Sequence, residues 1–290
     1  MWTSQGAQAH RFWGAATVNN ALHEFYDYAA IDGINPPPAG LDIYVGKSTD
    51  YGYALMSVQN QLSEAAGIAM GVASYWAGPF APLVAVVGWG VTKAYLPDVY
   101  IGTNFNKSDK LKSLAYHEIA HASHFTQVGS SFWEEVVIAE IYENGHGDQN
   151  SNGAELIAIC ESWADYIGGH LYVDCSYGPI FSGIRSWEDQ LERTWNESQN
   201  HIPVGLYHDL VDVGEPSFIS GGTIVTACNQ IDSGCTVITD PVSGFTNQQM
   251  FSCLTLSTFT LEDFRGCLIT NHLGATGNTV TQVNSLFNSY

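Results

Sequence analysis

The pattern of apolar and polar positions predicts a mostly helical chain with short strands in its first half. Apolar residues recur every three or four positions over residues 10–30, which predicts a first helix. Residues 41–47 (LDIYVGK) alternate between polar and apolar types as a half-buried strand does, and residues 98–103 (DVYIGT) read as a second strand. Further helices are predicted over residues 110–125, 132–142, 154–172, 206–212, 247–256, 261–270 and 280–290.

The segments between these elements carry turn and cap signals. Pro36–Pro38 cannot continue the first helix. A polar turn at residues 104–109 offers Ser108 or Asp109 as the cap of the next helix. Residues 143–153 (ENGHGDQNSNG) form a polar loop that is long enough to suggest a function.

One long segment carries no charge and resembles a membrane span at first sight. Ala65–Thr92 is interrupted by Pro79, Pro82 and several glycines, and its aromatic residues lie in its middle. A spanning helix needs about 20 continuous apolar residues, with aromatic residues near its ends. A buried helix–turn–helix is therefore the favoured prediction, and a membrane span is the alternative.

Composition narrows the range of partners. Apolar residues make up 45% of the chain, which is typical of a globular protein, and 29 acidic against 9 basic residues give a net charge of −20. A field of this sign repels phosphate groups, so nucleic acid and anionic membranes are poor partners. It is compatible with solubility, cation binding or attraction of basic substrates, and does not choose among them.

Six cysteines, none in a CxxC pair, favour disulfides and an oxidising compartment, with buried free thiols in a cytosolic protein as the alternative. Short loops favour Cys228–Cys235 and Cys253–Cys267, which leaves Cys160–Cys175, although six cysteines allow 15 pairings. The first residues lack the basic start and apolar core of a signal peptide. We expect a mature secreted or cell-surface domain whose export signal is absent from this sequence.

The strongest chemical signal is HEIAH at residues 117–121. Two histidines four residues apart on a helix point the same way, so His117 and His121 can bind one tetrahedral Zn²⁺. Glu118 then lies beside the metal, where it can take a proton from a zinc-activated water. Two partly exposed histidines on a surface helix would be the structural alternative.

A catalytic zinc needs a third protein ligand, and the segment ESWAD supplies a candidate. Glu161 and Asp165 stand four residues apart on a strongly apolar predicted helix, where a buried carboxylate needs a cation. Asp165 can accept the free ring N–H of a zinc histidine and so fix its tautomer. A lone Glu161 could otherwise be a solvated helix carboxylate.

HEIAH followed by ESWAD resembles the gluzincin clan of metallopeptidases, the thermolysin- and fungalysin-like enzymes, which pair HExxH with ExxxD. The resemblance implies an α+β, zincin-like fold: an upper lobe (1–125) with a small mixed sheet and the metal helix, and a mainly helical lower lobe (126–290). The metzincin group is excluded, because it requires a glycine at position 124 and a histidine or aspartate at position 127. This chain has His124 and Gln127, and His124 is interpreted as a surface or cleft-rim residue.

Two further sites are candidates. The resemblance implies a Tyr or His from the lower lobe that stabilises the oxyanion of the tetrahedral intermediate, and Tyr207 and His208 are the candidates. An amphipathic helix with exposed polar residues is the alternative there. Residues 148–153 (DQNSNG) match the first half of a calcium loop, with Asp148, Asn150 and Asn152 as possible Ca²⁺ ligands, but the glutamate required at its twelfth position is missing.

The resulting prediction is a monomeric zinc-dependent peptidase that acts on a peptide or protein, with Glu118 as general base. The predicted strand 98–103 would lie at the edge of the sheet and pair with an extended substrate. An endopeptidase is favoured, because no basic cluster offers an anchor for a terminal carboxylate. The alternatives are a catalytically inactive zinc-binding recognition domain and a surface or adhesion protein without metal.

Overall fold

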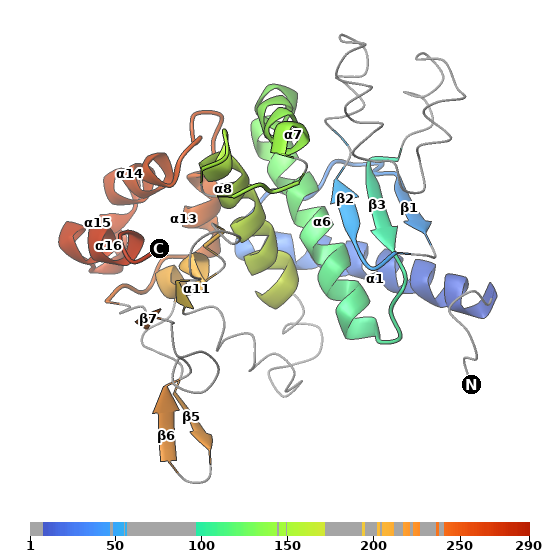
Figure 1. The fold of residues 1–290 in the computed structure, drawn as a ribbon, viewed down its shortest axis with the longest axis horizontal. Helices are drawn as coiled ribbons and strands as arrows, with labels where there is room; N and C mark the ends of the chain where they lie inside the picture. Colours follow the sequence, from blue (N-terminus) through green and yellow to red (C-terminus); the bar gives the residue numbers. More distant parts are fainter. Residues whose placement is uncertain are drawn as a thin grey trace.

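The protein is a mixed α and β structure that is mostly helical, with one three-stranded sheet and two short strand pairs (Figure 1). This confirms the α+β class at that level. The structure is a computed structural model that describes residues 8–46, 49–54, 56, 97–143, 145–148, 150–171, 193–194, 202–203, 205–211, 217–220, 223–226, 236–237 and 241–290. The predictions for Ala65–Thr92 and for Cys175, Cys228 and Cys235 lie outside the described residues.

The first half of the chain forms a helix and the small sheet. Helix α1 (Gln8–Asp32) is followed by strands β1 (Ile43–Gly46), β2 (Gly52–Ala54) and β3 (Val99–Gly102). The sheet order is β1-β3-β2, with β1 parallel and β2 antiparallel to β3. The prediction that the 98–103 strand is an edge strand is therefore wrong, because β3 is paired on both sides. Among the described strands, β2 forms the edge nearest to helix α6 (Ser108–Val128).

Helix α6 lies between the sheet and the second half of the chain (Figure 1). The Nζ atom of Lys112 lies 2.6 Å from a carboxylate oxygen of Glu24 on α1, and the Tyr116 hydroxyl donates to the same carboxylate. These contacts fix α6 against α1. Helix α6 begins after Lys107, which makes no side-chain capping bond, so the predicted cap at Ser108 or Asp109 is wrong. Asp109 in the first turn still favours the start of the helix, through its charge near the positive end of the helix dipole.

The next segment folds back along α6. Helix α7 (Ser130–Glu143) is followed by a turn-rich loop and helix α8 (Ala154–Ala164), which continues as a π-helix, η1 (Asp165–Leu171). The sequence predicted one regular helix over 154–172. The helical turns become wider from Asp165 onward, and such π-helical segments often occur at functional sites. It also brings Gly168 so close to α6 that an added Cβ would lie 2.1 Å from the backbone nitrogen of His117.

The last part of the chain is a group of short helices on the far side of α8 from the sheet (Figure 1). The helices α13, α14 and α16 each begin with a capping box led by a threonine. The remaining described elements are β4 (Arg193–Thr194), α11 (Leu206–Val211), β5 (Ser217–Ser220), β6 (Thr223–Thr226), β7 (Thr236–Val237), α13 (Asn247–Ser252), α14 (Leu261–Asn271), α15 (Leu273–Thr276) and α16 (Val280–Phe287).

Of the disulfide predictions, one is confirmed and one is wrong. A disulfide joins Cys253 to Cys267, as predicted, and ties the residue after α13 to α14 across 14 positions of sequence. Cys160 is a buried free thiol whose sulfur lies 3.9 Å from Nδ1 of His124. The predicted pairing of Cys160 with Cys175 is therefore wrong.

One hydrophobic cluster joins the two halves of the chain. It runs from Val18 on α1 through Ile119 on α6 and Trp163 on α8 to Phe287 on α16. Helices α6 and α8 thus share a core, which holds their facing side chains at defined separations. None of the helices in the described part of the chain has the length and apolar character to cross a membrane.

Candidate metal centre

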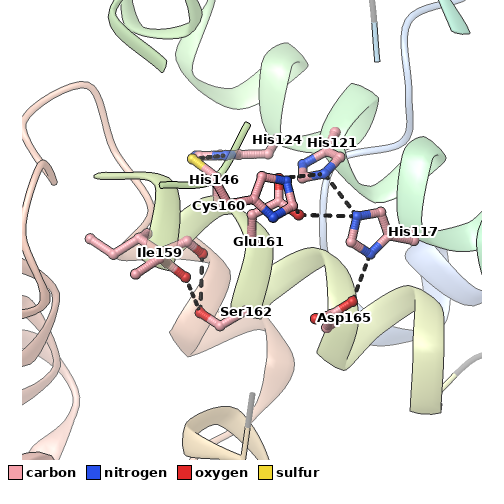
Figure 2. A network of polar contacts seen from close by, with 10 residues as sticks. His117, His121, His124, His146, Ile159, Cys160, Glu161, Ser162 and Asp165 are labelled. Carbon is pink, nitrogen blue, oxygen red and sulfur yellow. Dashed lines mark hydrogen bonds and ion pairs between the residues drawn. The ribbon is translucent and has the colours of Figure 1, made fainter. Parts of the chain in front are cut away.

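Helix α6 presents two histidine rings side by side. His117 and His121 stand one turn apart, and their Nε2 atoms are 3.1 Å from each other (Figure 2). The ring of His121 also packs edge-on against the indole of Trp133 on α7, with 5.3 Å between the ring centroids. Helical spacing brings the two nitrogens together, and the α7 contact holds one of the rings in place.

Glu161 on α8 reaches between the two histidines from the opposite side (Figure 2). Its Oε2 atom lies 3.3 Å from Nε2 of His117, and its Oε1 atom lies 3.2 Å from Nε2 of His121. Zinc bonds of 2.0–2.1 Å at tetrahedral angles require ligand atoms about 3.3 Å apart. The three observed separations therefore fit a tetrahedral ion, and the donors, two imidazoles and a carboxylate, are of the type that zinc prefers.

Asp165 holds the orientation of His117. Its Oδ1 atom lies 2.9 Å from Nδ1 of His117, so the ring donates there and directs Nε2 toward Glu161. Asp165 is the first residue of η1, one turn after Glu161. A carboxylate behind a ligand histidine fixes the tautomer and makes the ligand more basic. The sequence prediction of His117, His121, Glu161 and Asp165 as one group agrees with where the structure brings these side chains.

The electrostatics of the group favour a cation. Burial lowers the pKa of His117, but the carboxylates of Asp165 and Glu161 outweigh it and hold that pKa well above its usual value. Burial raises the pKa of Glu161, but the neighbouring histidines hold it well below its usual value. Burial lowers the pKa of His121. A divalent metal ion can replace the protons that an ionised carboxylate shares with two neighbouring imidazoles, so this arrangement favours metal binding.

Glu118 is buried, with 5% of its surface exposed, and it faces strand β2. A Cβ added to Gly52 would lie 2.5 Å from Oε1 of Glu118, so the edge strand passes directly over this carboxylate. Burial raises the pKa of Glu118 to about 8 in the metal-free protein. Glu118 therefore lies between the histidine pair and the edge of the sheet, and its carboxyl group can exchange a proton there.

Two further side chains lie close to Glu161, and the sequence analysis did not identify them. His146 follows α7, and its Nε2 atom is 3.6 Å from Oε2 of Glu161 (Figure 2). Glu140 on α7 completes a second trio with His146 and Glu161, whose ligand atoms all lie within 4.8 Å of one another. The only sequence signal was the long polar loop at 143–153, which contains His146.

The predicted oxyanion donors, Tyr207 and His208, contact aromatic residues of the core. Tyr207 is completely buried, and its ring contacts Trp163, Tyr166 and Phe264 in the core. His208 packs its ring on Tyr166. The contacts of Tyr207 are therefore those of a core residue, which speaks against the catalytic role predicted for it.

His124 is also placed differently from its interpretation as a surface residue. It is only 1% exposed, and its ring packs on Phe132 and Trp133. Burial lowers the pKa of its ring to about 3, so His124 is a neutral core residue. The reason is that α7 folds back over this face of α6, which helical spacing within α6 does not reveal.

The predicted calcium loop is a compact turn. Oδ1 of Asp148 accepts the N–H of Asn150 at 2.7 Å, and the hydroxyl of Ser151 accepts the N–H of Asp148 at 2.8 Å. Glu155, which could have replaced the missing twelfth ligand, accepts the backbone N–H of Leu261 at 3.2 Å instead. Calcium at Asp148, Asn150 and Asn152 stays a prediction from the sequence.

Comparison with known proteins adds no assignment to this geometry: no protein-family model, no curated protein and no solved structure matches the chain.

Proposed function

We propose that this chain is a zinc-dependent peptidase of the gluzincin kind, with a zincin-like fold and with His117, His121 and Glu161 as the metal ligands. The observation that carries the proposal is the convergence of three side chains. The Nε2 atoms of His117 and His121 are 3.1 Å apart, and the Glu161 carboxylate places Oε2 3.3 Å from the first and Oε1 3.2 Å from the second, separations close to those between the ligands of a tetrahedral zinc site. A chance cluster of buried histidines would not also have a carboxylate behind one ring and a second one beside the pair.

The roles of the side chains follow from their positions. A zinc ion held by His117, His121 and Glu161 would supply Lewis-acid chemistry: it would lower the pKa of a bound water from 15.7 to about 7 and polarise a carbonyl oxygen. Glu118 accepts the proton of the attacking water on a carboxylate oxygen and passes it to the leaving amine nitrogen. Asp165 keeps Nδ1 of His117 protonated and its Nε2 available.

The edge strand supports a peptide as the substrate. Strand β2 has its pairing partner β3 on one side, and Gly52 on β2 lies against Glu118. An extended peptide that pairs with the side of β2 where no other described strand pairs would run past the carboxylate, with main-chain hydrogen bonds that do not depend on its sequence. This mode accepts the middle of a polypeptide, so we propose an endopeptidase.

The compartment is part of the proposal. The Cys253–Cys267 disulfide is typical of proteins from oxidising compartments. Together with the net charge of −20, it supports a secreted or cell-surface peptidase.

Substitution of the general base tests the proposal. The purified protein should bind one zinc in the His117 site and cleave casein or an internally quenched peptide library. Glu118→Gln should keep this zinc and the fold but lose cleavage, because an amide cannot accept the proton. Glu135→Gln, an exposed glutamate on α7, is the matched control and should keep full activity.

Two results would contradict the proposal in different ways. Cleavage by Glu118→Gln at the parent rate would remove this residue as the base. Zinc binding by the parent protein without cleavage of any library peptide would instead favour a zinc-binding recognition domain.

A further inference from the structure

We propose that Glu140, His146 and Glu161 bind a second divalent cation, and that Glu161 bridges it to the zinc of the first site. This inference rests on the proposed function, because Glu161 belongs to both trios of potential ligands. It adds a metal site to which neither the sequence motif nor the proposed mechanism assigns any residue.

The two oxygens of Glu161 provide the geometry for a bridge. Oε1 lies 3.2 Å from His121, whereas Oε2 lies 3.3 Å from His117 and 3.6 Å from His146. The carboxylate thus has a third histidine nitrogen nearby, that of His146, in addition to the pair on α6 (Figure 2). Metal ions in two-metal hydrolytic sites lie about 3.5–4 Å apart, a separation that a bridging carboxylate can span.

The turn after α7 is built to bring His146 to this position. Gly145 donates its N–H to the carbonyl of Glu140 at 2.9 Å, which ends the helix and reverses the chain. Gly145 and Gly147 have φ angles of 129° and 70°, which favour glycine on both sides of His146. The backbone therefore places Glu140 and His146 beside each other, although six positions separate them.

The charges of the pocket leave room for a second cation. Four carboxylates, those of Glu118, Glu140, Glu161 and Asp165, surround the histidines. Among the described residues, the lysine and arginine salt bridges are elsewhere, at Lys112–Glu24 and Arg265–Glu262. A divalent ion bound by Glu140 and Glu161 would supply a positive charge that these lysine and arginine side chains do not supply.

The donor set indicates the class of ion and its relative affinity. One imidazole and two carboxylates suit Zn²⁺, Co²⁺ or Mn²⁺. The side chain of His146 is 49% exposed, whereas that of Glu161 is 6% exposed. The second ion would therefore be open to solvent on one side and bind more weakly than the zinc between His117 and His121, whose side chains are 18% and 5% exposed.

Zinc titration of the metal-free, full-length protein tests the site. Isothermal titration calorimetry should resolve two binding events, a tight one and a weaker one. His146→Ala and Glu140→Gln should each keep the tight event and weaken the other at least tenfold, since each removes one of three protein ligands. The exposed residues His23 and Glu135 supply the matched controls, and His23→Ala and Glu135→Gln should keep both events.

Manganese provides an independent measurement on the same variants. Two Mn²⁺ ions bridged by one carboxylate couple magnetically, so the parent protein loaded with two equivalents should give the electron paramagnetic resonance spectrum of a coupled pair. His146→Ala should give the spectrum of an isolated ion. This half-exposed residue is replaceable without disturbing the core, so its result stands even if Glu140→Gln fails to fold.

The outcomes separate this inference from the proposed function. One zinc equivalent in the parent protein, unchanged in His146→Ala, would overturn the second site and leave the first intact. Two equivalents in both His146→Ala and Glu140→Gln would also overturn the assignment of these ligands. Absence of zinc binding by the parent protein would overturn the second site and the proposed function together.

Discussion

Replacement of Asp165 by asparagine should weaken zinc binding without removing a metal ligand. The Oδ1 atom of Asp165 lies 2.9 Å from Nδ1 of His117, and this is the contact that holds the ring with its Nε2 toward Glu161. Asparagine has nearly the same shape, and its carbonyl oxygen can still accept the N–H. The substitution therefore removes the negative charge behind the ligand and leaves most of the packing unchanged.

The structure indicates the size of the effect. Loss of a carboxylate that orients a zinc ligand typically costs 10–100-fold in affinity. The side chain of Asp165 is 36% exposed, so water screens its charge, and the hydrogen bond survives in weaker form. We therefore expect the lower end of that range, about tenfold, which corresponds to about 1.4 kcal/mol. Glu161→Ala removes a ligand outright and should be much more damaging.

Competition with a zinc chelator of known affinity measures both variants on one scale. Asp27→Asn is the matched control, because Asp27 is exposed on α1 and carries the same charge change. The expected order of dissociation constants is parent and Asp27→Asn, then Asp165→Asn, then Glu161→Ala. Equal affinities for Asp165→Asn and Asp27→Asn would refute the role of Asp165 in orienting His117. Unchanged affinity in Glu161→Ala would refute the ligand set itself.

Two further predictions concern stability. Gly168→Ala should lower the unfolding free energy by about 1–3 kcal/mol and weaken zinc binding, because its Cβ would lie 2.1 Å from the His117 backbone nitrogen. Gly266→Ala is the control and should be neutral or stabilising, because Gly266 lies on a helix face with open space. Equal melting temperatures for the two variants would contradict the close packing at Gly168. Reduction of Cys253–Cys267 should lower the melting temperature without loss of zinc, since closing a loop of 14 residues contributes about 3 kcal/mol and no cysteine is a proposed ligand. Release of zinc by the reductant, measured with a colorimetric indicator, would show that a thiolate takes part.

The local elements were predictable where their periodicity was strong. The helix expected at 10–30 is α1, and the one expected at 110–125 is α6, because each has several turns of apolar spacing. Strand β2 has only three residues, Gly52–Ala54, and no alternation that distinguishes it from a turn. Its place at the edge of the sheet comes from its pairing with β3, a long-range contact that leaves no local mark. The same pairing is the reason why β3, expected at the edge, is in the middle.

The site shows the same division between local and long-range information. His117 and His121 follow from one helix, and Glu161 and Asp165 from another, because i and i+4 side chains share a face whatever the rest of the fold is. Tyr207 and His124 were misjudged because the expectation for each was drawn from its own short segment. The core assembled by α7, α8 and α14 buries both.

The sequence by itself therefore determined the elements with long apolar periods, the two pairs of residues at helical spacing, the acidic charge and one disulfide. Only the tertiary structure decided that the two pairs meet with ligand atoms 3.1–3.3 Å apart, that Gly52 brings the edge strand onto Glu118, and that Glu140 and His146 lie beside Glu161. The physical reason is the range of the interactions. Hydrogen bonding and side-chain periodicity act over four residues, whereas the packing of α6 against α8 and β2 depends on surfaces from distant parts of the chain.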